Sequence, residues 1–188
     1  SVCEWLFEVG AAADITKANN NGATPMYIAC QNGHLSVCKW LFEVGAAADI
    51  TKANNIGVTP MYIACRNGHL SVCEWLFEVG AAADITKANN NGATPMYIAC
   101  QNGHLSVCKW LFEVGAAADI TKANNIGVTP MYIACRNGHL SVCEWLFEVG
   151  AAADITKANN NGATPMYIAC QNGHLSVCKW LFEVGAAA

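Results

Sequence analysis

The chain has 188 residues, of which 54% are hydrophobic and only 13% charged, and its formal net charge is -4. A net negative charge provides no basic surface that would attract nucleic acid or an anionic membrane. No apolar run reaches the roughly 18 residues of a membrane span, because acidic residues such as Glu43 and Asp49 interrupt each one. The sequence therefore excludes both partners and predicts that much of the chain is buried.

The whole chain is one unit repeated every 35 residues, and the period shows most clearly in its Thr-Pro pairs. These pairs begin at residues 24, 59, 94, 129 and 164. Two kinds of copy alternate, since Asn21, Ala23, Gln31 and Lys39 of one copy become Ile56, Val58, Arg66 and Glu74 in the next. Copies of one kind are identical. Because drift blurs natural tandem repeats, we expect either a very recent duplication or an engineered protein, and we favour the second.

A first short helix is predicted directly after each Thr-Pro pair. The Thr24 hydroxyl is placed to cap free backbone amides, and Pro25 supplies the backbone angle of the first helical residue. Residues 26–30 are apolar and continue the helix, which Gly33 ends.

A second helix is predicted over residues 35–44. One face is apolar, and Gly45 supplies the left-handed conformation that ends the helix. Residues 46–48 then lead into the stretch 49–55, which is rich in asparagine and followed by glycine. This stretch predicts a tight turn or an extended finger, by which we mean the loop that leads to the next Thr-Pro pair.

Helix-turn-helix units of this kind bury their apolar faces only by stacking, so the predicted architecture is an all-α solenoid. We expect a single array over residues 1–188 with no separate domains. Its predicted parts are an N-terminal half-repeat with a second helix and finger (1–20), four repeats (21–55, 56–90, 91–125, 126–160) and a last repeat without its finger (161–188).

The segment GATPMYIACQNGHLSVCKWLFEVGA resembles an ankyrin repeat over essentially its full length, and the later units repeat the resemblance. The residues that match the family pattern are Gly22, Thr24, Pro25, Ala29, Gly33, His34, Leu35, Leu41, Gly45 and Ala46. The resemblance implies an ankyrin-type α-solenoid with short extended fingers.

Three departures from the ankyrin pattern put parts of that expectation in question. The usual repeat has about 33 residues, so Ala47 and Ala48 are two added residues between the second helix and the finger. Tyr27 replaces the histidine of the Thr-Pro-Leu-His motif, and Asn19 stands where the family mostly has aspartate. The family's hydrogen-bond network at the finger therefore cannot be carried over.

Cys30, His34 and Cys38 have the spacing C-x3-H-x3-C, which raises the question of a metal site in every repeat. In the ankyrin register each of the three has a structural position, and zinc needs four ligands where this triplet offers three. Buried cysteines are also poor nucleophiles, and we find no phosphate-binding loop or Gly-x-Ser-x-Gly motif. We predict no catalytic residue, no metal and no cofactor; a metal-binding array stays a third alternative.

The chain contains eleven cysteines, which recur on apolar helix positions rather than in irregular loops. Cysteine at such positions behaves as a small hydrophobe, so we expect reduced thiols rather than a disulfide framework. No basic segment followed by an apolar stretch resembles a signal peptide. These two features together predict a protein of the cytoplasmic type.

The resemblance implies a concave surface, built from finger tips and first helices, that recognises other proteins through the non-consensus positions. Three of the four alternating differences fall on this surface, although exposed sites also tolerate change. Ile56 and Ile126 are candidate apolar anchors; the alternative is that they pack against neighbouring fingers. The candidate partner-binding residues are Asn20, Asn21, Ala23, Gln31, Asn32, Asn55, Ile56, Val58, Arg66, Asn67, Asn90, Asn91, Gln101, Asn125, Ile126, Val128 and Arg136.

The predicted second helices carry two further rows of side chains along the array. The fourth alternating position predicts a ladder of alternating charge, formed by Glu4, Lys39, Glu74, Lys109, Glu144 and Lys179. Trp40 lies beside the polar stripe of its helix, so it and its copies predict a tryptophan row. We expect these tryptophans to pack between repeats rather than to bind a partner.

The sequence thus predicts a non-catalytic protein that serves as a protein-interaction or display scaffold, engineered and without need of a native target. The protein partner is unknown. The alternative is a self-assembling module, because the terminal helices VCEWLF and VCKWLF are as apolar as the internal ones and no polar cap is present. Two apolar ends of this kind would associate head to tail.

Overall fold

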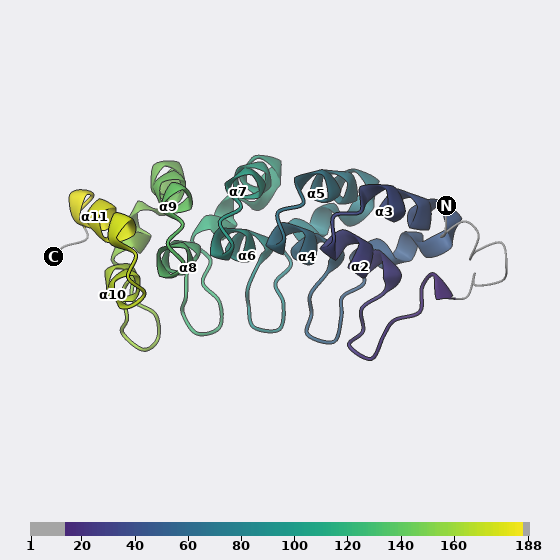
Figure 1. Ribbon diagram of the computed structural model, residues 1–188, viewed down its shortest axis with the longest axis horizontal. Helices are drawn as coiled ribbons and strands as arrows, with labels where there is room; N and C mark the ends of the chain where they lie inside the picture. The colour runs from purple at the N-terminus through teal and green to yellow at the C-terminus, as the bar shows by residue number, and fades with distance from the viewer. Residues whose placement is uncertain (1–13, 186–188) are drawn as a thin grey trace.

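The computed structural model describes residues 14–185, which form a solenoid of stacked helix-turn-helix units (Figure 1). The first helices of the units lie side by side, the second helices form a tier above them, and the fingers project below them. The first helices are α2 (Pro25–Gln31), α4 (Pro60–Arg66), α6 (Pro95–Gln101), α8 (Pro130–Arg136) and α10 (Pro165–Gln171). The second helices are α3 (Leu35–Leu41), α5 (Leu70–Leu76), α7 (Leu105–Leu111), α9 (Leu140–Leu146) and α11 (Leu175–Glu183).

Each first helix begins where the Thr-Pro pair predicts. The Thr24 hydroxyl accepts a hydrogen bond from the backbone N–H of Tyr27 at 3.2 Å, and Pro25 is the first residue of α2. The chain leaves the helix through Gly33, whose φ of 72° is left-handed. This confirms the predicted start and end of the helix.

The second helices α3, α5, α7 and α9 continue past their α-helical part as a wider π turn, whereas α11 stays α-helical to Glu183. In the first complete unit this turn contains Gly45 at φ 120°, and a 3-10 turn follows it. Ala47 and Ala48, the two added residues, open that 3-10 turn and are exposed. The π turns are Phe42–Ala46, Phe77–Ala81, Phe112–Ala116 and Phe147–Ala151, and the 3-10 turns are Ala47–Thr51, Ala82–Thr86, Ala117–Ile120 and Ala152–Ile155. The insertion is thus absorbed as one extra helical turn before the finger.

Each complete 3-10 turn buries an aspartate. Asp84 is 3% exposed and pairs with Lys87, three residues later, at 3.5 Å. Burial raises the pKa of the Asp84 carboxyl, and the nearby Lys87 opposes that shift. The pair lies where the 3-10 turn ends and the finger begins, since Lys87 directly follows the turn.

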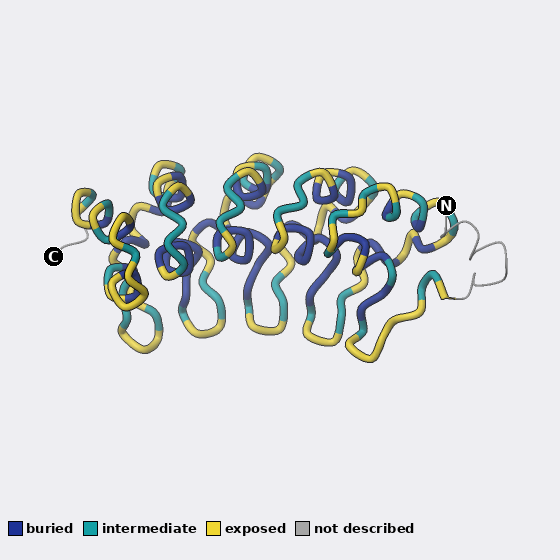
Figure 2. Tube along the Cα trace, in the orientation of Figure 1, coloured by how far each residue is buried: buried dark blue, intermediate teal, exposed yellow. Residues whose placement is uncertain are grey.

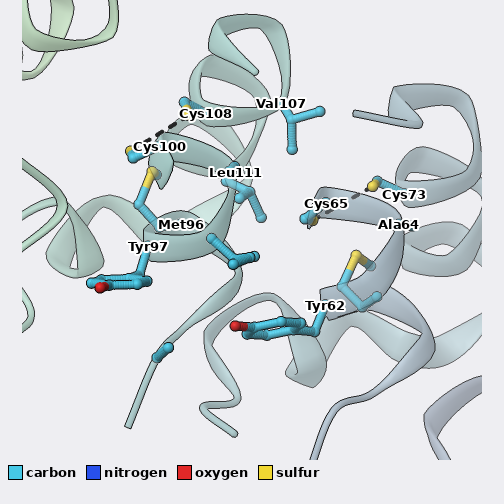
Figure 3. Packing of buried hydrophobic residues seen from close by; sticks show 14 of the residues in the cluster. Tyr62, Ala64, Cys65, Cys73, Met96, Tyr97, Cys100, Val107, Cys108 and Leu111 are labelled. Atoms are coloured by element: carbon cyan, nitrogen blue, oxygen red, sulfur yellow. Dashed lines mark hydrogen bonds between the residues drawn. The ribbon is translucent and has the colours of Figure 1, made fainter. Parts of the chain in front are cut away.

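The apolar core runs continuously along the array between the two helical tiers (Figure 2). Methionines of the first helices, such as Met61 and Met96, and leucines of the second helices, such as Leu111, are fully buried. Figure 3 shows the cysteines among them, with the sulfur atoms of Cys65 and Cys73 at 3.5 Å. Eight of the ten described cysteines are buried, which fits the predicted role of small core hydrophobes.

Candidate functional site

The finger of each unit is a tight turn held by one asparagine. In the first complete finger, the Asn54 N–H donates to the Val58 carbonyl and the Gly57 N–H donates to the Asn54 carbonyl, both at 3.0 Å. The Asn54 Oδ1 atom also accepts from the backbone N–H groups of Ile56 and Val58. Gly57 has φ 77°, and a Cβ atom there would come within 2.5 Å of the Asn90 Oδ1 atom. The predicted turn is confirmed, and glycine is needed both for its conformation and for the approach of the next finger.

The same asparagine links its finger to the first helix of the same repeat. The Asn54 side-chain amide donates to the Tyr27 hydroxyl at 3.4 Å, and the equivalent pair Asn159 and Tyr132 lies at 3.3 Å. Aspartate has no N–H group and could not donate this bond. The tyrosine and asparagine that depart from the ankyrin pattern therefore work as a matched pair, a relation that the sequence alone did not reveal.

Backbone hydrogen bonds hold neighbouring fingers in register. The Asn55 N–H donates to the Asn21 carbonyl at 3.0 Å, and the Asn90 N–H donates to the Ile56 carbonyl at 3.1 Å. The Asn55 side chain adds a bond to the Asn20 carbonyl at 3.0 Å. As a result the finger tips form one regular row, which Figure 1 shows along the lower edge of the molecule.

From His69 onward, a histidine of each repeat forms a hydrogen bond to a backbone carbonyl of the repeat before it. This contact is called here the histidine clasp. The His69 Nε2 atom lies 3.0 Å from the Gln31 carbonyl, and since a carbonyl only accepts, Nε2 carries the donated proton. The ring lies directly against Gly33, where a Cβ atom would come within 2.5 Å of it. His104, His139 and His174 repeat this bond to the carbonyls of Arg66, Gln101 and Arg136. The histidine of the Cys-His-Cys triplet thus faces the neighbouring repeat.

The candidate partner-binding residues separate into three groups by exposure. Most of them are exposed: Asn20, Asn21, Asn32, Asn55, Ile56, Arg66, Asn67, Asn90, Asn91, Asn125, Ile126 and Arg136. Gln31 and Gln101 are half-buried. Ala23, Val58 and Val128 are buried in the core, where Val58 is 5% exposed. Contact with a partner at the alternating positions therefore falls to the finger tips and to the ends of the first helices.

Some exposed candidates are already engaged within the array. The Asn67 amide donates to the Gln31 carbonyl of the preceding repeat at 2.6 Å, whereas its counterpart Asn102 donates to Ile98 of its own helix at 2.9 Å. By contrast Ile56 is 61% exposed. Among the described residues, Arg66 and Arg136 form no ion pair. The isoleucines and arginines are the alternating residues that remain available.

The outer face shows inter-repeat packing of its aromatic side chains. The rings of Phe42 and Trp75 meet edge to face at a centroid distance of 5.8 Å, and Phe77 meets Trp110 in the same way at 5.9 Å. This confirms the expected packing role of the tryptophan row. The charges of the predicted ladder from Lys39 to Lys179 are exposed and form no ion pairs with one another among the described residues, and Glu4 lies outside them.

The metal-ligand geometry and the buried thiols of the described residues bear on the Cys-His-Cys triplet. No group of three or more His, Cys, Asp or Glu residues in the range 14–185 is placed to hold a metal ion. Burial raises the pKa of the Cys65 and Cys100 thiols well above its usual range, which disfavours the nucleophilic thiolate.

The two ends of the array expose apolar surface that interior repeats cover. Tyr167 of α10 is 60% exposed, whereas its counterpart Tyr97 is 6% exposed, and Leu175 and Phe182 of α11 are 65% and 67% exposed. At the other end lies a pocket of about 650 Å³, whose lining includes Ile28 of α2. The other residues that line it include Ile15, Pro25, Ala29, Val37, Trp40 and Leu41.

Comparison with known proteins agrees with the repeat architecture. The family model for ankyrin repeats, which covers three copies, matches residues 1–89, 48–124, 80–157 and 118–188. Comparison with curated proteins finds no match. Of the helices within residues 14–185, none is long and apolar enough to cross a membrane.

Proposed function

Because the chain belongs to the ankyrin repeat family, whose repeats generally mediate protein–protein interaction and generally lack catalytic activity, we propose that it is a non-catalytic binding or display scaffold. The observation that carries this proposal is the regular row of exposed finger tips. Backbone hydrogen bonds fix its spacing, and the tip residue alternates between asparagine, as in Asn21, and isoleucine, as in Ile56.

The alternating residues define the chemistry of the partner. Ile56 and Ile126 place two apolar side chains two repeats apart, each about 60% exposed. Arg66 and Arg136 place two exposed cations at the ends of the first helices of the same repeats. A matching partner carries apolar contacts flanked by acidic groups at this two-repeat spacing, since arginine binds carboxylates in a bidentate manner.

The identity of all copies of each kind supports an engineered origin, and such a scaffold need have no native target. Uniform repeats display the same few side chains at every position, so they carry little information about one particular partner. Under this proposal, affinity for a chosen target is added by changing the tip and helix-end residues.

The test is to identify the main protein captured by the immobilised chain and to measure its Kd against Ile56→Ser/Ile126→Ser. Full burial of an isoleucine is worth about 1.5–3 kcal/mol, so loss of both side chains should weaken binding at least about tenfold. The matched control is Ser71→Ala/Ser141→Ala on the exposed side of α5 and α9, which should leave the Kd unchanged. Weaker binding by the control alone would place the interface on the outer face and contradict the proposal. Capture of no protein would favour the scaffold without a native target.

A second candidate function is head-to-tail self-association, which the exposed ends favour. The uncovered face of α10 carries Met166 and Tyr167. Their interior counterparts, Met131 and Tyr132, are buried on α8, the helix against which α10 packs. The pocket beside α2 lies where an interior repeat receives the first helix of its neighbour. The occupant we propose for this pocket is therefore α10 of a second copy of the chain, in continuity with the interior packing.

Light scattering coupled to size-exclusion chromatography over a hundredfold concentration range tests self-association. We expect a mass that rises with concentration for the unchanged chain, and a constant mass near 20 kDa for Tyr167→Ser/Phe182→Ser. A mass that stays near 20 kDa for the unchanged chain would remove this candidate. The isoleucine variant serves as the control, because its changes lie on the fingers and should not alter the mass.

A further inference from the structure

Neighbouring units meet at junctions that are not all alike, although each junction contains the histidine clasp. A unit means here one finger turn with the two helices that follow it. At the α2–α4 junction, the Asn67 side-chain amide donates across to the Gln31 carbonyl at 2.6 Å. At the α4–α6 junction, its counterpart Asn102 donates to its own helix at 2.9 Å. The next two junctions repeat this alternation, since Asn137 donates across the α6–α8 junction and Asn172 donates to its own helix α10.

The contacts between finger turns alternate in the same phase. The side-chain amides of Asn55 and Asn125 donate to the preceding turn at 3.0 and 3.1 Å, whereas those of Asn90 and Asn160 lie 3.5 Å from their acceptors. The usual length of such a bond is about 2.7–3.2 Å, so the longer contacts contribute little. The backbone bonds follow the pattern, at 3.0 Å for Asn55 and Asn125 but at 3.1 and 3.2 Å for Asn90 and Asn160. We call α2–α4 and α6–α8 the strong junctions, and α4–α6 and α8–α10 the weak junctions.

The alternation does not come from the ends of the array. The central unit, which contains α6 and α7, has a weak junction on one side and a strong junction on the other. Copies of the repeat differ only at four positions, and two of these positions supply carbonyls that accept bonds at the junctions. They are Gln31 or Arg66 at the end of the first helix, and Asn21 or Ile56 at the finger tip. The junctions therefore alternate with the period of the sequence itself.

We propose that the array consists of two-unit blocks, which stay closed at the strong junctions and open at the weak junctions. In a solenoid, stability is close to a sum of terms for the single units and for the interfaces between neighbours. Each strong junction has two side-chain hydrogen bonds of ordinary length that each weak junction lacks, represented by Asn67 and Asn55. One such bond changes an equilibrium constant by about 2- to 12-fold. The weak junctions should therefore open before the strong junctions do.

The blocks bear on the candidate binding surface, and this step rests on the proposed function. The block from α2 to α5 carries Ile56 and Arg66, and the block from α6 to α9 carries Ile126 and Arg136. The weak α4–α6 junction lies between these two sets of residues. A partner that contacts both sets holds this junction closed, so the spacing of the two sets depends on its closure.

Hydrogen exchange of the finger amides tests the blocks in the free chain, so its outcome does not depend on whether the proposed partner exists. Asn55 and Asn125 precede isoleucine, whereas Asn90 and Asn160 precede asparagine, so NMR connectivities separate their backbone amides into two classes. All four residues follow asparagine, which gives their amides the same exchange rate when unprotected. Rates are measured where they follow the hydroxide concentration, so that they report the opening equilibrium. The slowest signal of each class is compared, which removes the effect of the chain ends.

We expect the amides at the strong junctions to exchange about 5- to 150-fold more slowly than those at the weak junctions, which is the effect of two hydrogen bonds. Asn67→Ala/Asn137→Ala should accelerate exchange at the strong junctions about 2- to 12-fold and leave the weak junctions unchanged. The matched change Asn32→Ala/Asn102→Ala removes bonds within single helices, so it should preserve the difference between the classes. Circular dichroism checks that both variants keep their helices. Equal protection of the two classes in the unchanged chain would overturn the proposal, as would a first double variant that accelerates neither class or both classes equally.

Discussion

Replacement of His139 by alanine measures how much the histidine clasp between two repeats contributes to the free energy of unfolding. The His139 Nε2 atom donates to the Gln101 carbonyl at 3.0 Å, and its ring lies against Gly103. A hydrogen bond of this kind contributes about 0.5–1.5 kcal/mol, and the lost ring contacts add to it. We therefore expect His139→Ala to cost roughly 1–2 kcal/mol, counting a few tenths for the ring contacts. For a chain of this length, that corresponds to a decrease in Tm of roughly 2–8 °C.

His34 provides the control, because it occupies the same Gly-His-Leu turn but forms no clasp with another described residue. His34→Ala should change stability by less than about 0.5 kcal/mol. Both variants are compared by urea and thermal denaturation followed by circular dichroism, at a concentration where each is monomeric. Equal losses would refute the reasoning, because the histidine would then act within its own turn and not between repeats.

Three further predictions concern pH and the core. Burial lowers the pKa of His104, so the stability gained from its neutral form should be present above pH about 6.5 and lost as the pH falls below it, as urea midpoints between pH 8 and 5 would show. Burial raises the pKa of Tyr97 to about 12 from 10.0, so stability on the order of 2–3 kcal/mol should be lost as the pH rises from 10 to 12; tyrosinate absorbance and circular dichroism should change together. Leu111→Ala should cost about 2–5 kcal/mol in chemical denaturation because Leu111 is fully buried, whereas Leu175→Ala, at a residue 65% exposed, should cost less than about 1 kcal/mol.

Local chemistry was enough to predict the elements of each repeat. The Thr24 hydroxyl and the fixed backbone angle of Pro25 act within one helical turn, so their effect follows from adjacent residues. Gly45 likewise interrupts the helical backbone after the second helix through its own positive φ. The stacking of these units was predictable too, since a single helical hairpin cannot bury its apolar face.

The candidate binding surface was only partly predictable. Alternation between copies drew attention to Ile56 and Val58 together, but the turn directs Ile56 to solvent and Val58 into the core. The sequence also did not reveal that the Asn67 amide is occupied by the preceding repeat, or that Asn54 and Tyr27 form a pair. These relations join residues about one repeat apart, so no local pattern encodes them.

The cysteines show most clearly where local sequence stops being informative. Cys100 and Cys170 have identical neighbours in the sequence and lie at the same position of identical first helices. Nevertheless Cys100 is 0% exposed and Cys170 is exposed to solvent. The sequence by itself determined the helices, the turns and the repeat, because these depend on contacts within a few residues. Only the tertiary structure decided which copies are buried, because burial in a solenoid depends on whether another repeat packs against the same face.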